Sequence, residues 1–254
     1  HPNNHINMSQ STNDVYPTAI KLTLHELIYK LKDSLRFLRD CFEEKSVEFK
    51  DVLKMGRTQL QDAVPMTLGQ EFKTFAVMID ADIYRLRDVQ AHLREVNLGA
   101  TAIGTGINSK AAYQRKVISN LREVTGVDYV AAGDLIEATQ DTGSFVHISG
   151  MLKSIAIKIS KICNDLRLLS SGPRAGFNEI NLPPLQPGSS IMPGKVNPVM
   201  PEVVNQVAFE VIGADMTIAM ASEHGQLQLN VFEPLIAFKL FNSINMMRRA
   251  FHSL

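Results

Sequence analysis

The sequence lacks the motifs of the common redox, zinc and nucleophile sites. Its only two cysteines, Cys41 and Cys163, are far apart and do not form a CxxC pair. Neither an HExxH zinc-protease motif nor a GxSxG nucleophile elbow occurs. These absences exclude several hydrolase and metalloenzyme classes. We interpret both cysteines as buried thiols.

The sequence also lacks an excess of charge of either sign and long apolar runs. The 26 basic and 26 acidic residues give a formal net charge of +0, so no overall field attracts nucleic acid or an anionic membrane. No uninterrupted apolar stretch of about 18 residues occurs, and the N-terminus has neither the basic start nor the apolar run of a signal peptide. We expect a small-molecule ligand, no nucleic-acid or membrane partner, and a cytoplasmic location.

The composition that is present is typical of a globular domain. The chain has 254 residues, of which 45% are hydrophobic and 20% charged. It opens on an Asn-rich loop and stops inside the apparently helical segment SINMMRRAFHSL without a C-cap signal. We therefore expect residues 1–254 to be the central helical domain of a longer protein, without that protein's N-terminal and C-terminal domains.

Three segments place apolar residues in steps of three and four, which is the pattern of a helix that buries one face. They predict a helix from about Pro17 to Lys54, a second that starts near Leu68 and closes by Asn97, and a third that ends at 170–173. Two more helices are expected, one with Pro201 at its first position and one from about Glu233. No period-two alternation is long enough to predict a sheet. The apolar seams are Leu24, Ile28, Leu31, Leu35, Leu38 and Phe42; Leu68, Phe72, Phe75, Ile79, Ile83 and Leu86; and Ile148, Leu152, Ile155, Ile159, Ile162, Leu166 and Leu169.

Such long helices need partners. Helices of about 30 to 38 residues would be about 45 to 57 Å long. The predicted fold class is therefore all-α, an elongated bundle of long helices completed by other subunits, with a self-contained monomeric bundle as the alternative. We expect the chemistry in the connections. Polar residues, glycine and proline concentrate in four of them, at 3–14, 56–65, 99–108 and 172–198.

The connection GSSIMPGKVNP, residues 188–198, is the most informative segment. Its glycines and prolines forbid a regular helix, and its serines, lysine and asparagine could surround an anion. Lys195 adds a full positive charge. The alternative is a structural linker with a solvated lysine.

Two further connections are ambiguous from the residues alone. Ser11 to Asp14 could be an N-cap cluster of the first helix, or could use the same hydroxyl and N–H groups to hold a carboxylate. GRTQLQDAVP offers Thr58 and Gln59 as neutral hydrogen-bond partners, although surface loops often have this composition. These segments become informative in combination.

Two segments with a motif-like appearance do not predict a site. GATAIGTG, residues 99–106, has no following GK[ST] and no preceding strand, so we do not expect a nucleotide. His1 and His5 are four residues apart, but Pro2 makes a shared helical face improbable and no carboxylate completes a ligand set. We predict no metal site.

Together the blocks resemble the aspartase/fumarase superfamily of carbon–heteroatom lyases. GSSIMPGKVNP resembles the signature of that superfamily, and HPNNHINMSQSTNDVYPTA, GRTQLQDAVPMTLGQEF, GATAIGTGIN and SGPRAGFNEINLP resemble its other blocks in order. The resemblance implies a tetrameric core of twenty long helices, active sites shared between subunits, a small dicarboxylate substrate and no cofactor. The branch that it resembles most converts L-aspartate to fumarate and ammonia.

The resemblance also implies roles for individual residues. Ser189 matches the loop serine that abstracts the C3 proton and leaves an aci-carboxylate. Lys195 and Asn197 match the pair that binds the C1 carboxylate. The other carboxylate would be held by Ser11, Thr12 and Ser190, and the leaving ammonia would be surrounded by Asn13, Thr58 and Gln59.

One position separates the two main branches. Fumarases of the superfamily carry a histidine in the block GRTH, which pairs with a carboxylate at the position of Glu202. This chain has Gln59 there, which weakens the alternative of a fumarate hydratase acting on malate and fumarate, although some aspartases also carry the histidine. Glu202 then keeps a supporting role. A noncatalytic helical assembly module is the second alternative, and the set Ser189, Lys195 and Asn197 argues against it. A threonine that contacts the anion in the family would lie upstream of residue 1.

Overall fold

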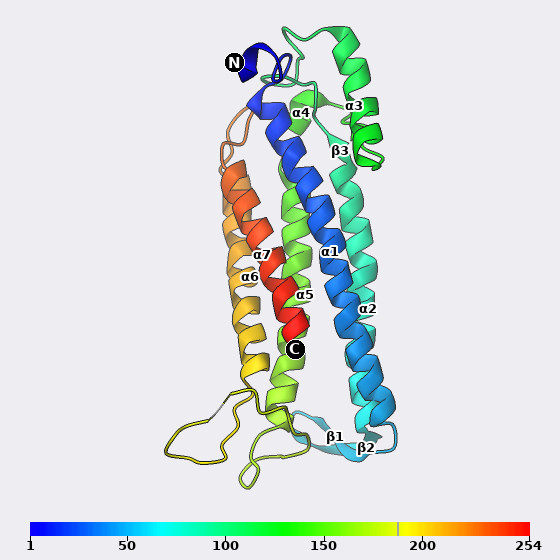
Figure 1. Ribbon diagram of the computed structural model, residues 1–254, viewed down its shortest axis with the longest axis vertical. Coiled ribbons are helices and arrows are strands. Elements are labelled where there is room, and N and C mark those ends of the chain that lie inside the picture. Colours follow the sequence, from blue (N-terminus) through cyan, green and yellow to red (C-terminus); the bar gives the residue numbers. More distant parts are fainter. Residues whose placement is uncertain (187) are drawn as a thin grey trace. The chain divides into compact units, whose positions relative to one another are not determined.

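The computed structural model describes residues 1–186 and 188–254 (Figure 1). Pro187, inside the predicted connection 172–198, lies outside the described residues. In the described part, five long α-helices dominate, and each contributes residues to both of two compact units. These are α1 (Thr12–Glu48), α2 (Leu68–Ala91), α5 (Gly143–Leu169), α6 (Val199–Glu223) and α7 (Glu233–Ser253). The all-α prediction is confirmed.

The three apolar seams are buried in full. Every seam residue has at most 7% of its surface exposed, and Leu24, Leu35 and Ile148 have none. Burial of one side chain of this size contributes about 1.5 to 3 kcal/mol. The seams therefore identify the faces on which the helices pack, as the period of the sequence predicts.

Unit 1 comprises residues 1–29, 86–152 and 213–244. Besides parts of the long helices it contains η1 (Pro2–Asn4), η2 (His92–Arg94), α3 (Ala111–Thr125) and α4 (Leu135–Gln140). Two short parallel strands, β3 (Glu95–Val96) and β4 (Val130–Ala131), pair beside α3. Val96, Ile118 and Tyr129 form a small buried cluster there. Neither α3 nor α4 is predicted by the sequence pattern.

Unit 2 comprises residues 30–85, 153–212 and 245–254. Four phenylalanines contact one another in this unit, Phe42, Phe49, Phe72 and Phe75, and the rings in contact have centroids 5.4 to 6.0 Å apart. Cys163 is buried as predicted, and burial raises the pKa of its thiol to about 12. Cys41 is only half-buried, so the prediction of two buried thiols holds for one of them.

An antiparallel hairpin in unit 2 corrects the prediction that no sheet forms. β1 (Leu53–Thr58) pairs with β2 (Gln61–Thr67), and Figure 1 shows this hairpin between α1 and α2. The predicted helix to Lys54 therefore ends at Glu48. Half of the residues of β1 and most of those of β2 are exposed and none is buried, so neither strand has the long apolar alternation by which a half-buried strand is predicted.

Helix boundaries differ from prediction at both prolines. α1 begins at Thr12 rather than Pro17, which lies inside the helix, and Pro201 occupies the third position of α6 rather than the first. α6 is also long and apolar enough to cross a membrane by length and composition, with a mean hydropathy of 1.3 over its best window. Glu210 and Asp215 place two charged side chains within that helix, and core helices of soluble proteins pass the same test. The prediction of a single domain over 1–254 stays a prediction.

Candidate active site

The first turn of α1 is closed by a reciprocal cap in unit 1. The backbone N–H of Asn13 donates to Ser11 Oγ at 3.1 Å, and the N–H of Ser11 donates to Asp14 Oδ1 at 2.9 Å. The N-cap interpretation of this run is therefore correct for Ser11 and Asp14. A hydroxyl that accepts one bond can still donate another, so Ser11 can cap the helix and contact a carboxylate as well.

Asp14 also ties this turn to the glycine-rich connection 99–106. Its side chain is fully buried, and its Oδ2 accepts from the N–H groups of Gly99 at 3.1 Å and Thr101 at 2.9 Å. Asn13 Nδ2 donates to the carbonyl of Ala102 at 2.7 Å. Two backbone donors of this connection are thus bound to a carboxylate of the protein itself.

Thr58 and Gln59 lie at the tip of the β1–β2 hairpin in unit 2. Both are exposed, and the turn residues Gln59 and Leu60 have φ values of 52° and 64°. Positive φ at both central positions is typical of the tight turn that matches the twist of a hairpin. Gln59 lines a pocket of about 330 Å³ together with Arg57, Lys161 and Phe177.

An ion network runs along β1, from Lys54 near the start of the strand to Arg57 beside the turn. Lys54 Nζ contacts Glu71 Oε2 at 2.5 Å and Glu179 Oε2 at 3.1 Å, and Arg57 pairs with the other oxygen of Glu179. The guanidinium of Arg57 lies 4.5 Å from the ring centroid of Phe177. Burial acts to raise the pKa of Glu179, but hydrogen bonds from Arg57 and Lys54 outweigh it and the pKa is lowered. The pKa of Arg57 is raised by the same bond.

The connection 188–198 closes on itself in a compact turn. A Cβ on Gly188 would lie 2.0 Å from the carbonyl oxygen of Lys195, so only glycine permits this approach. Gly194 has a φ of 81°, which also favours glycine. The N–H of Met192 donates to the carbonyl of Ser189 at 3.1 Å, and the N–H of Lys195 donates to that of Met192 at 3.2 Å.

Ser189 is half-buried in this turn, and the neighbouring Ser190 is exposed. The backbone N–H of Ile191 donates to Ser189 Oγ at 3.3 Å. A donor directed at an oxygen stabilises the negative charge that the oxygen acquires when it loses its proton. One backbone donor is therefore directed at Ser189 Oγ within this turn.

Lys195 and Asn197 line one pocket of about 310 Å³, together with Asn178 and Asn181. A cation among amide side chains can bind a carboxylate and orient it. Ser189 does not line this pocket, nor the one at Gln59. Glu202 is half-buried in the first turn of α6, where its N–H donates to the carbonyl of Pro198 at 3.2 Å.

The predicted site residues thus fall into sets that neither unit assembles alone. Ser11, Thr12 and Asn13 belong to unit 1, whereas Thr58, Gln59 and the residues from 189 to 202 belong to unit 2. Within unit 2, Gln59 and Lys195 line different pockets. The geometry brings together Lys195 with Asn197, Thr58 with Gln59, and the three residues of the first α1 turn.

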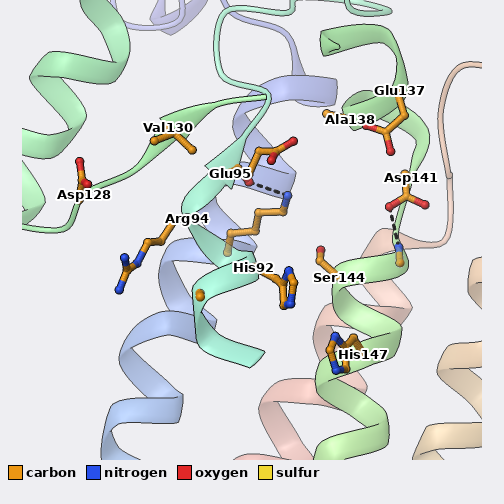
Figure 2. Close-up of a pocket in the computed structure, with 13 residues that line it drawn as sticks. His92, Arg94, Glu95, Asp128, Val130, Glu137, Ala138, Asp141, Ser144 and His147 are labelled. Atoms are coloured by element: carbon orange, nitrogen blue, oxygen red, sulfur yellow. Dashed lines mark hydrogen bonds between the residues drawn. The ribbon is translucent and has the colours of Figure 1, made fainter. Parts of the chain in front are cut away.

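A further pocket in unit 1 contains none of the predicted residues. It encloses about 510 Å³, and Figure 2 shows titratable side chains of several elements around it. Lys21 Nζ donates to the carbonyl of Glu95 at 2.7 Å, and burial lowers the pKa of this lysine. Burial and then the neighbouring Asp141 raise the pKa of Glu137. Within 1–186 and 188–254, no group of three or more His, Cys, Asp or Glu side chains could hold a metal ion.

Sequence reasoning missed the side chains that hold these segments in place. Asp14, Asn97 and Glu179 are not predicted as functional, and their partners lie far away along the chain. Asp14 contacts residues 85 and 87 positions on, and Glu179 contacts the hairpin more than 100 residues before it. The one local signal is the spacing of Ser11 and Asp14, which is that of a capping box.

Comparison with known proteins places the chain in a family. The family described as Lyase matches residues 1–213. The aspartate ammonia-lyase of Helicobacter pylori is 62% identical over 254 residues, which are 100% of this chain and 54% of that protein. The chain spans about half the length of the curated relatives it matches.

Solved structures agree with this match. A fumarate lyase:delta crystallin from Brucella melitensis, bound to cobalt, has a TM-score of 0.97 and 57% identity over 99% of this chain and 55% of its own. The class II fumarase of Schistosoma mansoni has a TM-score of 0.94 at 34% identity, over 99% of this chain and 56% of its own. With the sequence blocks, the buried seams and the family match in agreement, the chain belongs to the lyase family.

Proposed function

We propose that the protein carrying this chain converts L-aspartate to fumarate and ammonia. The observation that supports this most strongly is the 62% identity, over the whole chain, to a protein named as an aspartate ammonia-lyase. Gln59, in place of the histidine of fumarases, points in the same direction. In this proposal residues 1–254 form the central helical part of the enzyme.

The difficult step is removal of a proton from C3. A C–H group beside a carboxylate is a weak acid, because its loss places a second negative charge on that carboxylate. The C3 proton goes to Ser189, and the electron pair forms the aci-carboxylate. The pair then returns to form the C2–C3 double bond while the C2–N bond breaks, and the nitrogen leaves with its bonding electrons as ammonia.

Ser189 acts as the base in this scheme. A serine hydroxyl is a weak base until it is deprotonated. The N–H of Ile191, directed at Ser189 Oγ, supplies one donor that favours the alkoxide. Closure of the 188–194 turn over the substrate would remove water and strengthen this effect.

The two carboxylates of the substrate have different requirements. Lys195 and Asn197, which line one pocket, bind the C1 carboxylate, whose charge is present throughout the reaction. Ser11, Thr12 and Ser190 hold the carboxylate on which charge develops. Preorganised donors at such a position are worth about 3 to 4 kcal/mol each in the transition state.

The leaving ammonia requires acceptors rather than donors. Asn13 commits its Nδ2 to the carbonyl of Ala102, so the oxygen of the same amide is the atom that it offers to an ammonium group. Thr58 and Gln59 supply neutral groups from the hairpin turn, and Glu202 supports the site from the first turn of α6. No cofactor takes part in this chemistry, and we propose a cytoplasmic location.

A homotetramer would bring the separate sets of residues together. α6 exposes large apolar side chains at Phe209, Met216 and Met220, with 57% to 65% of each accessible. Positions 209, 216 and 220 lie seven and four residues apart, and therefore on one face of the helix. Burial of this face against other subunits agrees with sites that draw Ser11, Gln59 and Ser189 from different chains.

The test is an assay of the full-length protein with two substrates. We expect rapid fumarate formation from L-aspartate and little from L-malate. Faster turnover of malate would support the fumarate hydratase alternative, for which the similarity to the Schistosoma mansoni fumarase is the favouring observation. Turnover of neither substrate would support the noncatalytic assembly module. Residues 1–254 alone should have little or no activity.

A further inference from the structure

The β1–β2 hairpin has little apolar packing to hold it in place. The first five residues of β2 are exposed, and an isolated two-stranded hairpin is at best marginally stable in water. Its turn nevertheless keeps two residues at positive φ, Gln59 and Leu60. Some other contact must therefore fix the position of the turn.

Glu179 supplies that contact through both of its oxygens. Its Oε2 meets Lys54 Nζ at 3.1 Å, and its Oε1 pairs with Arg57. These two cations are three residues apart on β1, and a register shift between Met55 and Arg57 interrupts the regular alternation of sides. One carboxylate thus forms ion pairs with two residues of the same strand.

Most of this network is withdrawn from solvent. The side chain of Lys54 is 8% exposed, that of Glu179 is 20% exposed and that of Arg57 is 22% exposed. Charges in such a setting are screened much less than surface pairs. Loss of the Glu179 charge leaves Arg57 without its ion-pair partner, whereas Lys54 keeps Glu71, so the link between the hairpin and the segment of Glu179 is expected to weaken.

The segment that carries Glu179 is itself anchored to the end of α5. The N–H of Glu179 donates to the carbonyl of Leu169 at 2.9 Å, and the N–H of Asn178 donates to that of Ser171 at 2.8 Å. A Cβ on Gly176 would lie 2.4 Å from the carbonyl carbon of Ser171, so this fold-back requires glycine. Glu179 therefore contacts the hairpin from a segment that backbone hydrogen bonds hold against the end of α5.

The neighbours of Glu179 reach the other candidate pocket. Asn178 and Asn181 line the pocket that also contains Lys195 and Asn197. Glu179 thus connects the hairpin, which carries Thr58 and Gln59, with the segment that lines the pocket of Lys195. No other described carboxylate pairs with both Lys54 and Arg57.

We infer that Glu179 is a positioning residue of the enzyme, which holds the Thr58–Gln59 turn at a fixed place relative to the segment of Asn178 and Asn181. This inference rests on the proposed function of Gln59. Glu179 touches no reacting atom in this account. Glu179 acts through the hairpin, so its replacement should lower turnover only to the extent that turnover depends on the position of Gln59.

The experiment is a double-mutant cycle in the full-length protein. Glu179→Gln keeps the shape of the side chain and removes its charge, and we expect kcat/KM for L-aspartate to fall by about tenfold or more, since displacement of about 1 Å can cost about a hundredfold. Gln59→Ala is measured alone and combined with Glu179→Gln. If Glu179 acts through the turn, Glu179→Gln should lower kcat/KM much less in the Gln59→Ala background than it does in the wild type. Glu48→Gln, in an exposed pair with Lys45, is the matched control.

A second readout does not depend on activity. Amide hydrogen exchange over residues 53–67 should accelerate in Glu179→Gln while exchange in the middle of α5 stays unchanged. Should Glu179→Gln fail to fold, Arg57→Gln removes the same contact from the other side and is read identically. Additive losses, or a loss no larger than that of Glu48→Gln, would overturn the inference. A wild-type protein inactive on aspartate would refute the proposed function, and the exchange data would then decide the positioning role alone.

Discussion

The side-chain amide of Asn97 donates to the backbone carbonyl of Asn13 at 3.0 Å. That carbonyl is the one left without a helical donor, because the residue four positions on is Pro17, which has no N–H group. A side chain 84 positions away thus completes the first turns of α1. This explains how the helix begins at Thr12 although proline interrupts it.

Asn97→Ala should destabilise the protein by about 1 to 3 kcal/mol, because it leaves the carbonyl of Asn13 and the hydroxyl of Thr139 without this donor. Denaturant titration measures the change in free energy of unfolding. In a Pro17→Ala background the helical N–H returns, so the cost of Asn97→Ala should be smaller. An equal cost in both backgrounds would show that the amide does not substitute for the missing donor.

Asp14→Ala should cost at least as much, because three backbone N–H groups lose a buried carboxylate acceptor. We expect a loss of about 3 kcal/mol or more in the free energy of unfolding. Faster hydrogen exchange at the amides of Gly99 and Thr101 would locate the effect. Unchanged exchange there would contradict the account of how the 99–106 connection is held.

Glu233 should make stability depend on pH. It is 5% exposed, and burial raises its pKa from 4.5 to about 7, although Lys21 acts in the opposite direction. The folded state therefore binds this proton more tightly than the unfolded state. Its contribution is fully present below pH 4.5 and is lost as the pH rises through about 7, by up to about 3 kcal/mol.

Glu233→Gln removes that titration. Between pH 4.5 and about 7, the free energy of unfolding should fall less steeply in this variant than in the wild type. The exposed Glu48→Gln variant serves as the control and should follow the wild-type profile. Parallel profiles for Glu233→Gln and the wild type would place the pH dependence elsewhere.

Lys195→Ala should mainly weaken substrate binding in the full-length protein. Its charge meets a carboxylate that is charged before and during the reaction, so the interaction stabilises substrate and transition state alike. We expect a rise in KM larger than the fall in kcat. A variant with unchanged KM and a greatly reduced kcat would assign Lys195 to the charge that develops in the transition state instead.

Periodic burial made the long helices predictable. Leu24, Phe72 and Ile155 lie on faces whose spacing the sequence displays, and each is buried. The hairpin was not predictable in this way, since its turn uses Gln59 and Leu60 rather than an Asn-Gly pair and its strands bury little. α3 was missed for a related reason: Ile118 is the only one of its residues that is buried.

In the candidate site, too, features with a local sequence pattern could be predicted and those without one could not. Short blocks such as GSSIMPGKVNP carry their chemistry in the local sequence, so Ser189 and Lys195 could be named from resemblance. The contacts that place such blocks join distant segments. Asp14 with Gly99 and Glu179 with Lys54 leave no local pattern, because a carboxylate in a polar stretch is compatible with many partners.

The most direct test of the proposed chemistry compares wild type and Ser189→Ala in the full-length protein, with L-aspartate binding and fumarate formation measured on the same preparations. We predict that both proteins bind L-aspartate with similar affinity and that the variant forms fumarate about 10²- to 10⁴-fold more slowly, as expected for loss of a positioned base. Turnover by Ser189→Ala at a rate close to that of the wild type would contradict the account.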